Sequence, residues 1–208
     1  MDDSRNRRGS ESSRQAILDA AEALFADLGF EAVSMERIGH AAGLSRGAPG
    51  YFFGSKKALY RAVLQRMFDS AEALVEETRQ GIAAAPPYDT DRALEIVVEN
   101  LLEFLYERPH FLTLVERETL RRSGVTGGTR AHLSLLRTAL EAIAGELQVD
   151  MPEKEQLLLS LLGLCWFPLA NPLLIRDLGG RLDRRFVEAR KRHVVALLRA
   201  GVRGRAPA

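Results

Sequence analysis

The chain has 208 residues, of which 46% are hydrophobic and 27% charged, and its formal net charge is +1. This balance is typical of a globular protein and argues against an intrinsically disordered chain. The longest apolar run, 157–170, has 14 residues and contains Pro168, so it is too short to cross a bilayer of ~30 Å. The polar N-terminus resembles no secretory signal, and the single cysteine, Cys165, excludes an internal disulfide. We therefore expect a cytoplasmic protein with no membrane partner.

The first elements in the chain are short helices. Residues 1–11 read as a flexible polar tail, and helical periodicity then predicts a helix from Ser12 to Leu28, ended by Gly29. Ser34 is a typical N-cap for a second helix of about two turns, which Gly43 ends, and Ser45 is the next candidate cap. Two short helices joined by so tight a turn cross at a steep angle, as in a helix-turn-helix.

The rest of the chain is predicted to be helical as well. Ser55 caps a long helix from Lys56 to about Gln80. Further helices are expected over 90–107, 109–122, 129–147, 152–175 with disturbances at its prolines, and 183–200. No strand pattern is present, so we predict an all-α fold of about nine helices. It comprises a three-helix domain of the helix-turn-helix type over 12–55, a connecting helix over 56–80 and a larger domain over 81–208.

Charge is distributed unevenly along the chain. Between residues 34 and 66 there are six basic side chains and one acidic one, a net charge of +5 in a nearly neutral protein. Lys56 and Lys57 fall in the first turn of a helix, where the macrodipole disfavours cations. A bound phosphate would remove this conflict, because helix N-termini bind anions. Two solvated surface lysines are the alternative, and the surrounding basic window favours nucleic acid as the partner.

Two stretches, IGHAAGLSRG and YFFGSKKAL, carry a resemblance to a known family. With Ser34 they are similar to the DNA-binding domain of the TetR family of bacterial transcriptional regulators, over about 50 residues. The resemblance implies that Ser34 touches a phosphate, that Tyr51 contacts the DNA backbone or thymine methyls and that Lys56 binds a phosphate. It also implies that the recognition helix starts at Ser45, Arg46, Gly47 and Ala48. Arg46 is the candidate for reading a guanine, or it holds a phosphate.

The segment Ala48-Pro49-Gly50 departs from the family pattern. Pro49 has no backbone N–H to donate to Ser45, so the recognition helix is expected to begin irregularly or later than in typical members. Gly50 removes one expected aromatic contact. We therefore predict fewer direct base contacts than in typical members and more dependence on Arg46, Tyr51 and backbone geometry.

The larger domain shows no catalytic or metal-binding constellation, and nothing in it implies a cofactor. The four histidines are scattered, and Cys165 is expected to be inert core, with an oxidation sensor as the alternative. The resemblance implies an effector pocket, for which the aromatic and apolar candidates are Phe104, Phe111, Leu112 and Trp166, although each could be ordinary core. Polar groups that could orient a ligand are Glu116, Arg117, Glu118 and Arg137.

The last two long helices carry more apolar surface than one subunit needs, which favours a two-fold interface. Its candidate residues are Leu161, Leu164, Phe186, Val194, Leu197 and Leu198. The sequence thus leads to the hypothesis of a homodimeric regulator that binds a palindromic double-stranded operator and is released by a small apolar effector. The alternative is an all-helical interaction or scaffold protein without DNA binding.

Overall fold

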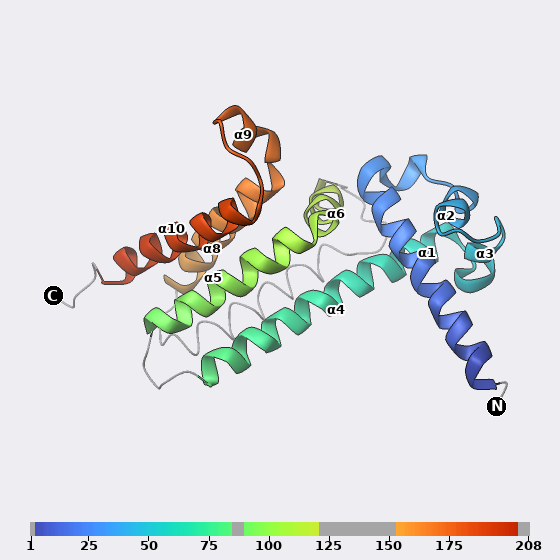
Figure 1. Cartoon of the computed structure of the whole chain (residues 1–208), viewed down its shortest axis with the longest axis horizontal. Coiled ribbons are helices and arrows are strands. Elements are labelled where there is room, and N and C mark those ends of the chain that lie inside the picture. The colour runs from blue at the N-terminus through green and yellow to red at the C-terminus, as the bar shows by residue number, and fades with distance from the viewer. Residues whose placement is uncertain (1–2, 85–89, 121–152, 204–208) are drawn as a thin grey trace. The chain divides into compact units, whose positions relative to one another are not determined.

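The computed structural model describes residues 3–84, 90–120 and 153–203, and every regular element in these ranges is an α-helix. The bounds of the nine helices, drawn in Figure 1, are α1 Asp3–Ala32, α2 Met35–Ala41, α3 Ala48–Phe53, α4 Lys56–Ala83, α5 Thr90–Glu107, α6 Pro109–Leu120, α8 Glu153–Ala170, α9 Pro172–Asp177 and α10 Arg184–Arg203. The all-α prediction is confirmed. The helix predicted over 129–147 lies outside the described residues, as does Arg137.

The chain divides into two compact units. The first contains α1, α2, α3, α4 up to Asp69 and α6 from Thr113, and the second contains the remainder of α4 and α6 together with α5, α8, α9 and α10. This division differs from the sequence-based one, which assigned α6 wholly to the larger domain. The difference arises because two side chains of α6, Arg117 and Glu118, bond to groups of α1 and α4.

Helix α1 is longer than predicted, because it begins at Asp3. Residues 3–11, expected to be a flexible tail, form its first turns, and the tail assignment is corrected here. The addition of polar residues to an existing helix gains a hydrogen bond for each residue fixed, without the cost of nucleation. Gly29, with φ of 79°, interrupts the helix where the sequence predicted its end.

The core of the first unit is formed by apolar side chains of α1, α2 and α4. Ile17, Ala21 and Phe25 of α1, Ile38 of α2 and Leu59 are fully buried. Phe25, Phe30 and Tyr60 form an aromatic cluster in which both phenylalanine rings lie 5.0 Å from the Tyr60 ring. Ion pairs from Arg66 of α4 to Asp19 and Glu22 of α1, each at 2.5 Å, flank this core.

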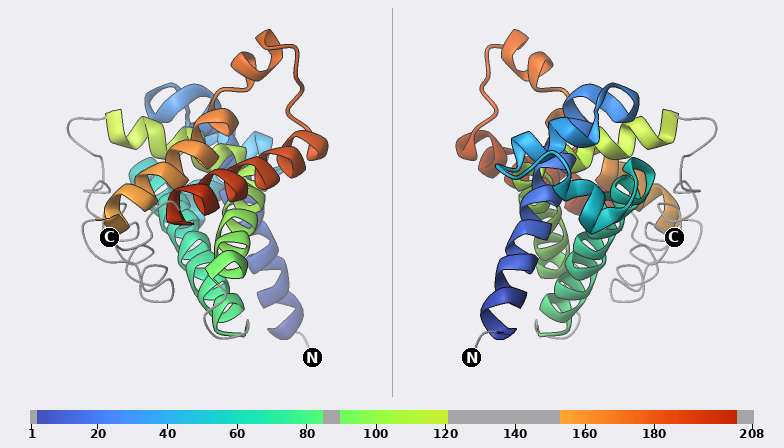
Figure 2. Two further views of the ribbon diagram at one scale, coloured as in Figure 1. Left: turned by 90° about the vertical axis from the view of Figure 1, so that its left-hand side faces the viewer. Right: turned by 90° about the vertical axis from the view of Figure 1, so that its right-hand side faces the viewer.

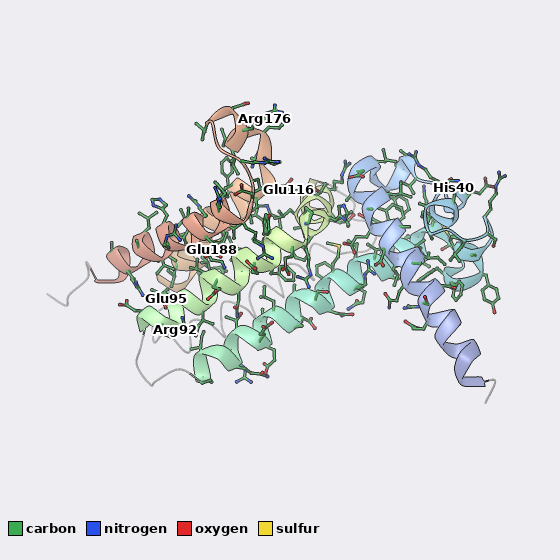
Figure 3. The ribbon with its side chains drawn as sticks, in the orientation of Figure 1. His40, Arg92, Glu95, Glu116, Arg176 and Glu188 are labelled. Carbon is green, nitrogen blue, oxygen red and sulfur yellow. The ribbon has the colours of Figure 1, made fainter. Side chains whose placement is uncertain are left out.

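The second unit is organised around α5, which packs against both α8 and α10. A row of carboxylates at four-residue spacing runs along α5, formed by Asp91, Glu95, Glu99, Glu103 and Glu107. We call this row, together with the basic side chains of α10 that pair with it, the acidic ladder. Arg184 pairs with Glu103 and Glu107. Lys191 pairs with Glu99 and Glu103, and Arg199 pairs with Asp91 and Glu95. Figure 3 shows Arg92 and Glu95 together at one end of α5.

Candidate nucleic-acid interface

Helix α2 is defined by the residues at its two ends. The Ser34 hydroxyl accepts a hydrogen bond from the backbone N–H of Arg37 at 3.2 Å, which confirms Ser34 as the N-cap. Glu36 lies in the first turn, where the helix dipole favours an anion. At the other end Gly43 adopts φ of 68°, and the N–H of Leu44 bonds to the carbonyl of Gly39 at 2.9 Å. These bonds close a tight turn toward the next helix.

The crossing of α2 and α3 depends on Gly39, a residue that the sequence analysis did not identify. A Cβ atom at this position would lie 2.6 Å from the carbonyl oxygen of Ser45 and 3.2 Å from Cδ of Pro49. The two helices therefore approach each other through a hydrogen atom rather than a side chain. A glycine inside a helix lowers stability by about 0.5–1 kcal/mol relative to alanine. Its presence in so short a helix was therefore the sequence signal that another part of the chain approaches closely at this position.

Helix α3 begins at Ala48, and its N-cap is Gly47, which offers no side-chain cap. The predicted cap at Ser45 is therefore wrong: the Ser45 carbonyl accepts from the N–H of Ala48 at 3.0 Å in a turn that precedes the helix. Pro49 falls in the first turn, where its missing N–H is not needed for the helix. Its ring is buried close to Gly39 of α2. Gly54, with φ of 75°, ends α3 after six residues.

The predicted DNA-contacting residues on and before α3 are accessible. Ser34, Ser45, Arg46 and Gly47 are exposed, and Ala48 is half-buried. The side chain of Tyr51 is 85% exposed and meets the ring of Phe52 edge-on at 5.3 Å between centroids. Exposed cationic or titratable side chains nearby in the chain are Arg37, His40, Lys57 and Arg61; Figure 3 labels His40 on α2.

Lys56, predicted to bind a phosphate, binds backbone carbonyls of its own chain in the structure. Its ammonium group donates to three backbone carbonyls beyond the kink of α1, those of Phe30 at 2.9 Å, Glu31 at 3.3 Å and Val33 at 3.0 Å. It also lies 4.5 Å from the centre of the Phe30 ring. The lysine thus satisfies carbonyls at the end of one helix while it begins another. The sequence offered a bound phosphate or plain solvation for this lysine, and the structure adds a third explanation, the backbone carbonyls. Lys57 is exposed.

The end of α1 is bound a second time, by α6. The Arg117 guanidinium donates to the carbonyls of Ala26 at 3.0 Å and Asp27 at 3.2 Å, and it fills the space beside Gly29. The carboxylate of the next residue, Glu118, accepts a hydrogen bond from the Tyr60 hydroxyl at 2.6 Å. Arg117 and Glu118 were candidates for orienting a ligand, but in the structure they bind α1 and α4 of the first unit.

The candidate pocket residues of the second unit form a cluster. The rings of Phe104 and Phe111 meet edge-on at 5.1 Å, and Phe111 meets Trp166 at 6.0 Å. Leu112 is buried as well. The structure therefore brings together aromatic side chains from three helices, α5, α6 and α8, that the sequence suggested as pocket candidates.

The predicted dimer residues differ in their exposure. Leu161, Val194 and Leu198 are buried inside the subunit, so they have little surface left for a partner. Leu164 and Phe186 are half-buried, and Leu197 is exposed. The exposed large apolar residues of α8 are Leu159 and Phe167 instead. Helix α8 is apolar on nearly every side, so its sequence has no periodicity that marks the buried face.

Cys165 is fully buried, and burial raises the pKa of its thiol to about 12 although the nearby charge of Arg190 acts in the opposite direction. Because the thiolate is the reactive form, this thiol is poorly suited to redox sensing. Within the described ranges no three histidine, cysteine or acidic residues are grouped so as to hold a metal ion. No helix in those ranges is both long enough and apolar enough to span a bilayer.

Fold and site together define an all-helical protein with an N-terminal helix-turn-helix. Residues 17–63 match the model of the bacterial regulatory proteins of the tetR family. The helix-turn-helix segment is therefore similar to that of the tetR family, as the motifs suggested.

Relatives with assigned roles are similar over part of the chain. The chain is 36% identical over 104 residues to the transcriptional activator FasR of Mycolicibacterium smegmatis, covering 48% of this chain and 45% of that protein. It is 37% identical over 76 residues to the transcriptional regulator RutR of Escherichia coli, covering 36% of each chain. A 28% identity to the transcriptional repressor NicS of Pseudomonas putida covers 53% of this chain and 50% of that protein. The chain thus spans about half or less of the length of these relatives.

Solved structures extend the similarity of fold to nearly the whole chain. A TetR-like transcriptional regulator from Rhodococcus sp. RHA1 has a TM-score of 0.65 at 22% identity, covering 92% of this chain and 96% of that one. FadR from Bacillus subtilis, in complex with stearoyl-CoA, has a TM-score of 0.60 at 16% identity, covering 89% and 97%. At these identities the likeness establishes the fold alone.

Proposed function

We propose that the protein is a DNA-binding transcriptional regulator of the repressor type that binds a palindromic operator as a homodimer and is released by a small apolar effector. The observation that carries the proposal is the helix-turn-helix itself, with α3 held on α2 at Gly39 and with Arg46 and Tyr51 exposed beside it. Among the relatives, FasR is an activator and NicS a repressor.

DNA recognition is proposed to depend on few side chains. Pro49 is buried and Gly50 has no side chain, which leaves Arg46 and Tyr51 as the groups at this helix that can reach a base edge. Arg46 would donate to a guanine, a contact worth about 1–3 kcal/mol of discrimination when bidentate. Exposed Ser34 and Lys57 would bind phosphates and position the helix without reading sequence.

Dimerisation is proposed to use the exposed faces of α8 and α10. On α8 the exposed residues Leu159, Gly163 and Phe167 follow one another at four-residue spacing, and on α10 the exposed Leu197 lies among small residues, Ala196 and Ala200. An apolar strip of this kind suits a two-fold helix-helix contact. Two copies of the helix-turn-helix can then read the two halves of a palindrome.

The effector is proposed to bind near the Phe104, Phe111 and Trp166 cluster. We propose that two helices carry a signal from there along the chain: α4, which we predicted as the connecting helix, and α6. Helix α6 contributes Phe111 to the cluster and, two turns later, Glu118 to the buried bond with Tyr60. A ligand that favours a different position of α6 would alter these contacts, with a typical coupling of about 1–3 kcal/mol.

The test is selection of random duplex DNA on the purified protein, followed by titration of the best sequence at two salt concentrations. We expect a palindromic site whose affinity falls with salt and weakens with Arg46→Ala. Arg79→Ala is the matched control, because Arg79 is an exposed arginine of α4 in the second unit. Operator release is then screened with apolar small molecules, including a long-chain acyl-CoA as bound by FadR.

If folded protein enriches no sequence, the DNA-binding proposal is wrong. If the selected site binds but no compound in the screen changes its affinity, DNA binding stands and the apolar effector is not supported. An increase rather than a loss of operator affinity with a compound would replace release by co-repression or activation.

A further inference from the structure

The segment between α8 and α10, residues 171–183, forms an arm that projects from these helices (Figures 1 and 2). It contains α9, and its base is tied to α8 by the Asn171 side-chain amide, which donates to the carbonyl of Phe167 at 2.8 Å. Figure 3 shows Arg176 on this arm, away from the body of α8 and α10.

The arm has a defined structure of its own. The N–H of Gly179, with φ of 80°, bonds to the carbonyl of Arg176 at 2.9 Å, and the N–H of Gly180 bonds to that of Ile175 at 2.9 Å. A Cβ at position 180 would lie 3.0 Å from Ile175, so the chain folds back closely over this buried side chain. These bonds close α9 with a left-handed glycine, and the arm is therefore a preformed element.

Three leucines of the arm are turned outward. Leu173 and Leu174 are exposed and Leu178 is 79% exposed, while Ile175 alone is buried. Leucine side chains on one rigid element, held in water without cover, are a feature of interaction sites rather than of ordinary surface. The exposed Phe167 at the end of α8 continues the same apolar surface toward the body of the unit.

The location and charge of the arm indicate a second copy of this chain as the partner. In the described part of the second unit, all six exposed large apolar residues lie on α8, α9 and α10 or at the C-cap of α9. The arm is therefore continuous with the face proposed for dimerisation. Its helix carries one cation and one anion, Arg176 and Asp177, both exposed, so it has no net charge that would favour nucleic acid or an anionic surface.

We propose that the arm of one copy packs its leucines against the α8 and α10 surface of a second copy and so extends the homodimer interface beyond these two helices. The inference rests on the homodimer of the proposed function. It adds a specific role for Leu173, Leu174 and Leu178 and makes the interface reciprocal, because each copy supplies one arm and receives one.

The direct test is photo-crosslinking with p-benzoylphenylalanine in place of Leu178. Copies that carry heavy and light nitrogen are mixed before irradiation, so that peptides joined between two copies differ in mass from peptides joined within one chain. We expect mixed-isotope products that join the arm to α8 or α10. Products joined only within one chain overturn the proposal.

The quantitative test compares Leu173→Ser with Leu178→Ser and measures the dimer dissociation constant by sedimentation. Each change should raise the constant roughly tenfold or more, because a buried leucine is lost from the interface. Leu28→Ser is the control, since Leu28 is an exposed leucine of the first unit. A melting temperature close to that of the unchanged protein at high concentration shows that a variant is folded.

Two kinds of failure are distinguishable. If Leu159→Arg gives monomers while both arm variants dimerise like the unchanged protein, the dimer stands and the arm has no part in it. If the unchanged protein is monomeric at all concentrations, the homodimer of the proposed function fails and the arm proposal fails with it.

Discussion

The hydroxyl of Tyr60 in α4 donates to the carboxylate of Glu118 in α6 at 2.6 Å, and Glu118 is only 1% exposed. Its second carboxylate oxygen, Oε2, has no hydrogen-bond partner among the described residues. The hydroxyl of one aromatic residue is therefore the polar partner of a fully buried acid at the junction of two helices. Loss of this bond would leave the acid unsatisfied.

From this relationship we predict that Tyr60→Phe lowers the free energy of unfolding by about 1–3 kcal/mol, the cost of an unsatisfied buried polar group. Urea unfolding monitored by circular dichroism measures the loss. The double change Tyr60→Phe with Glu118→Leu should recover part of it, because both polar partners are then removed. Equal stability of Tyr60→Phe and the unchanged protein would show that the bond contributes nothing.

Gly39→Ala is predicted to disturb the helix-turn-helix. The added methyl group would lie 2.6 Å from the Ser45 carbonyl, a backbone atom that cannot move without α3. We expect destabilisation of about 1–3 kcal/mol from overpacking and a larger relative loss of operator affinity, because the displaced turn carries Arg46. Gly47→Ala is the control, since a Cβ there meets no atom within 4 Å. Wild-type affinity in a folded Gly39→Ala protein would contradict the prediction.

Lys56 and Lys57 should differ in what they do. Lys56→Ala removes donors from three carbonyls beyond the kink of α1, so stability should fall by about 1–3 kcal/mol. Lys57→Ala should leave stability nearly unchanged, weaken binding to all DNA sequences similarly and reduce the salt slope by about 1. Chemical denaturation and salt-dependent titration of both variants measure the difference. The assignment is reversed if Lys57→Ala is the destabilising change.

The acidic ladder predicts how stability depends on pH. Hydrogen bonds from Arg92 and Arg199 hold the pKa of Glu95 below its ordinary value of 4.5. Burial raises the pKa of Glu103, but Arg184 and Lys191 outweigh it and leave this pKa below 4.5 as well. A depressed carboxylate pKa stabilises the fold above the unfolded value, and this contribution is lost as pH falls through the folded one.

We therefore expect the free energy of unfolding to fall as pH is lowered below about 4.5, and to fall less steeply in Glu95→Gln than in the unchanged protein. Thermal melts between neutral and acid pH measure the two slopes. Glu72→Gln, which removes an exposed carboxylate of α4, is the control. Parallel slopes for all three proteins would show that the ladder does not contribute.

Local signals predicted the elements well, since their causes are adjacent in sequence. Helix α5 was predicted with the bounds that it has, Thr90 to Glu107, and the Ser34 cap was found because cap and bonded N–H are three residues apart. The interruption at Gly29 was likewise a local property of glycine. The predicted cap at Ser45 was wrong, but the start of α3 at Ala48 agrees with the later beginning that Pro49 led us to expect.

Contacts between distant segments were not predictable in the same way. The carbonyls that Lys56 binds are 23–26 residues earlier in the chain, and those bound by Arg117 are about 90 residues earlier, so no sequence spacing connects them. The buried face of α8 was also undetermined, because a helix that is apolar all round has no polar side to mark its exposure. For that reason Leu161 was expected at a dimer surface, and Leu159 is the exposed residue.

The burial of Cys165 has a practical consequence for distance measurements. Since the protein has one cysteine, and its thiol is buried with a pKa of about 12, a cysteine introduced at an exposed position would be the thiol that takes up a probe. A spin label at Lys57→Cys would then report, by electron paramagnetic resonance, the distance between the two helix-turn-helix domains of the proposed dimer. Cys165 would not need to be replaced. That separation, with and without a candidate effector, is the quantity on which the proposed release from the operator depends.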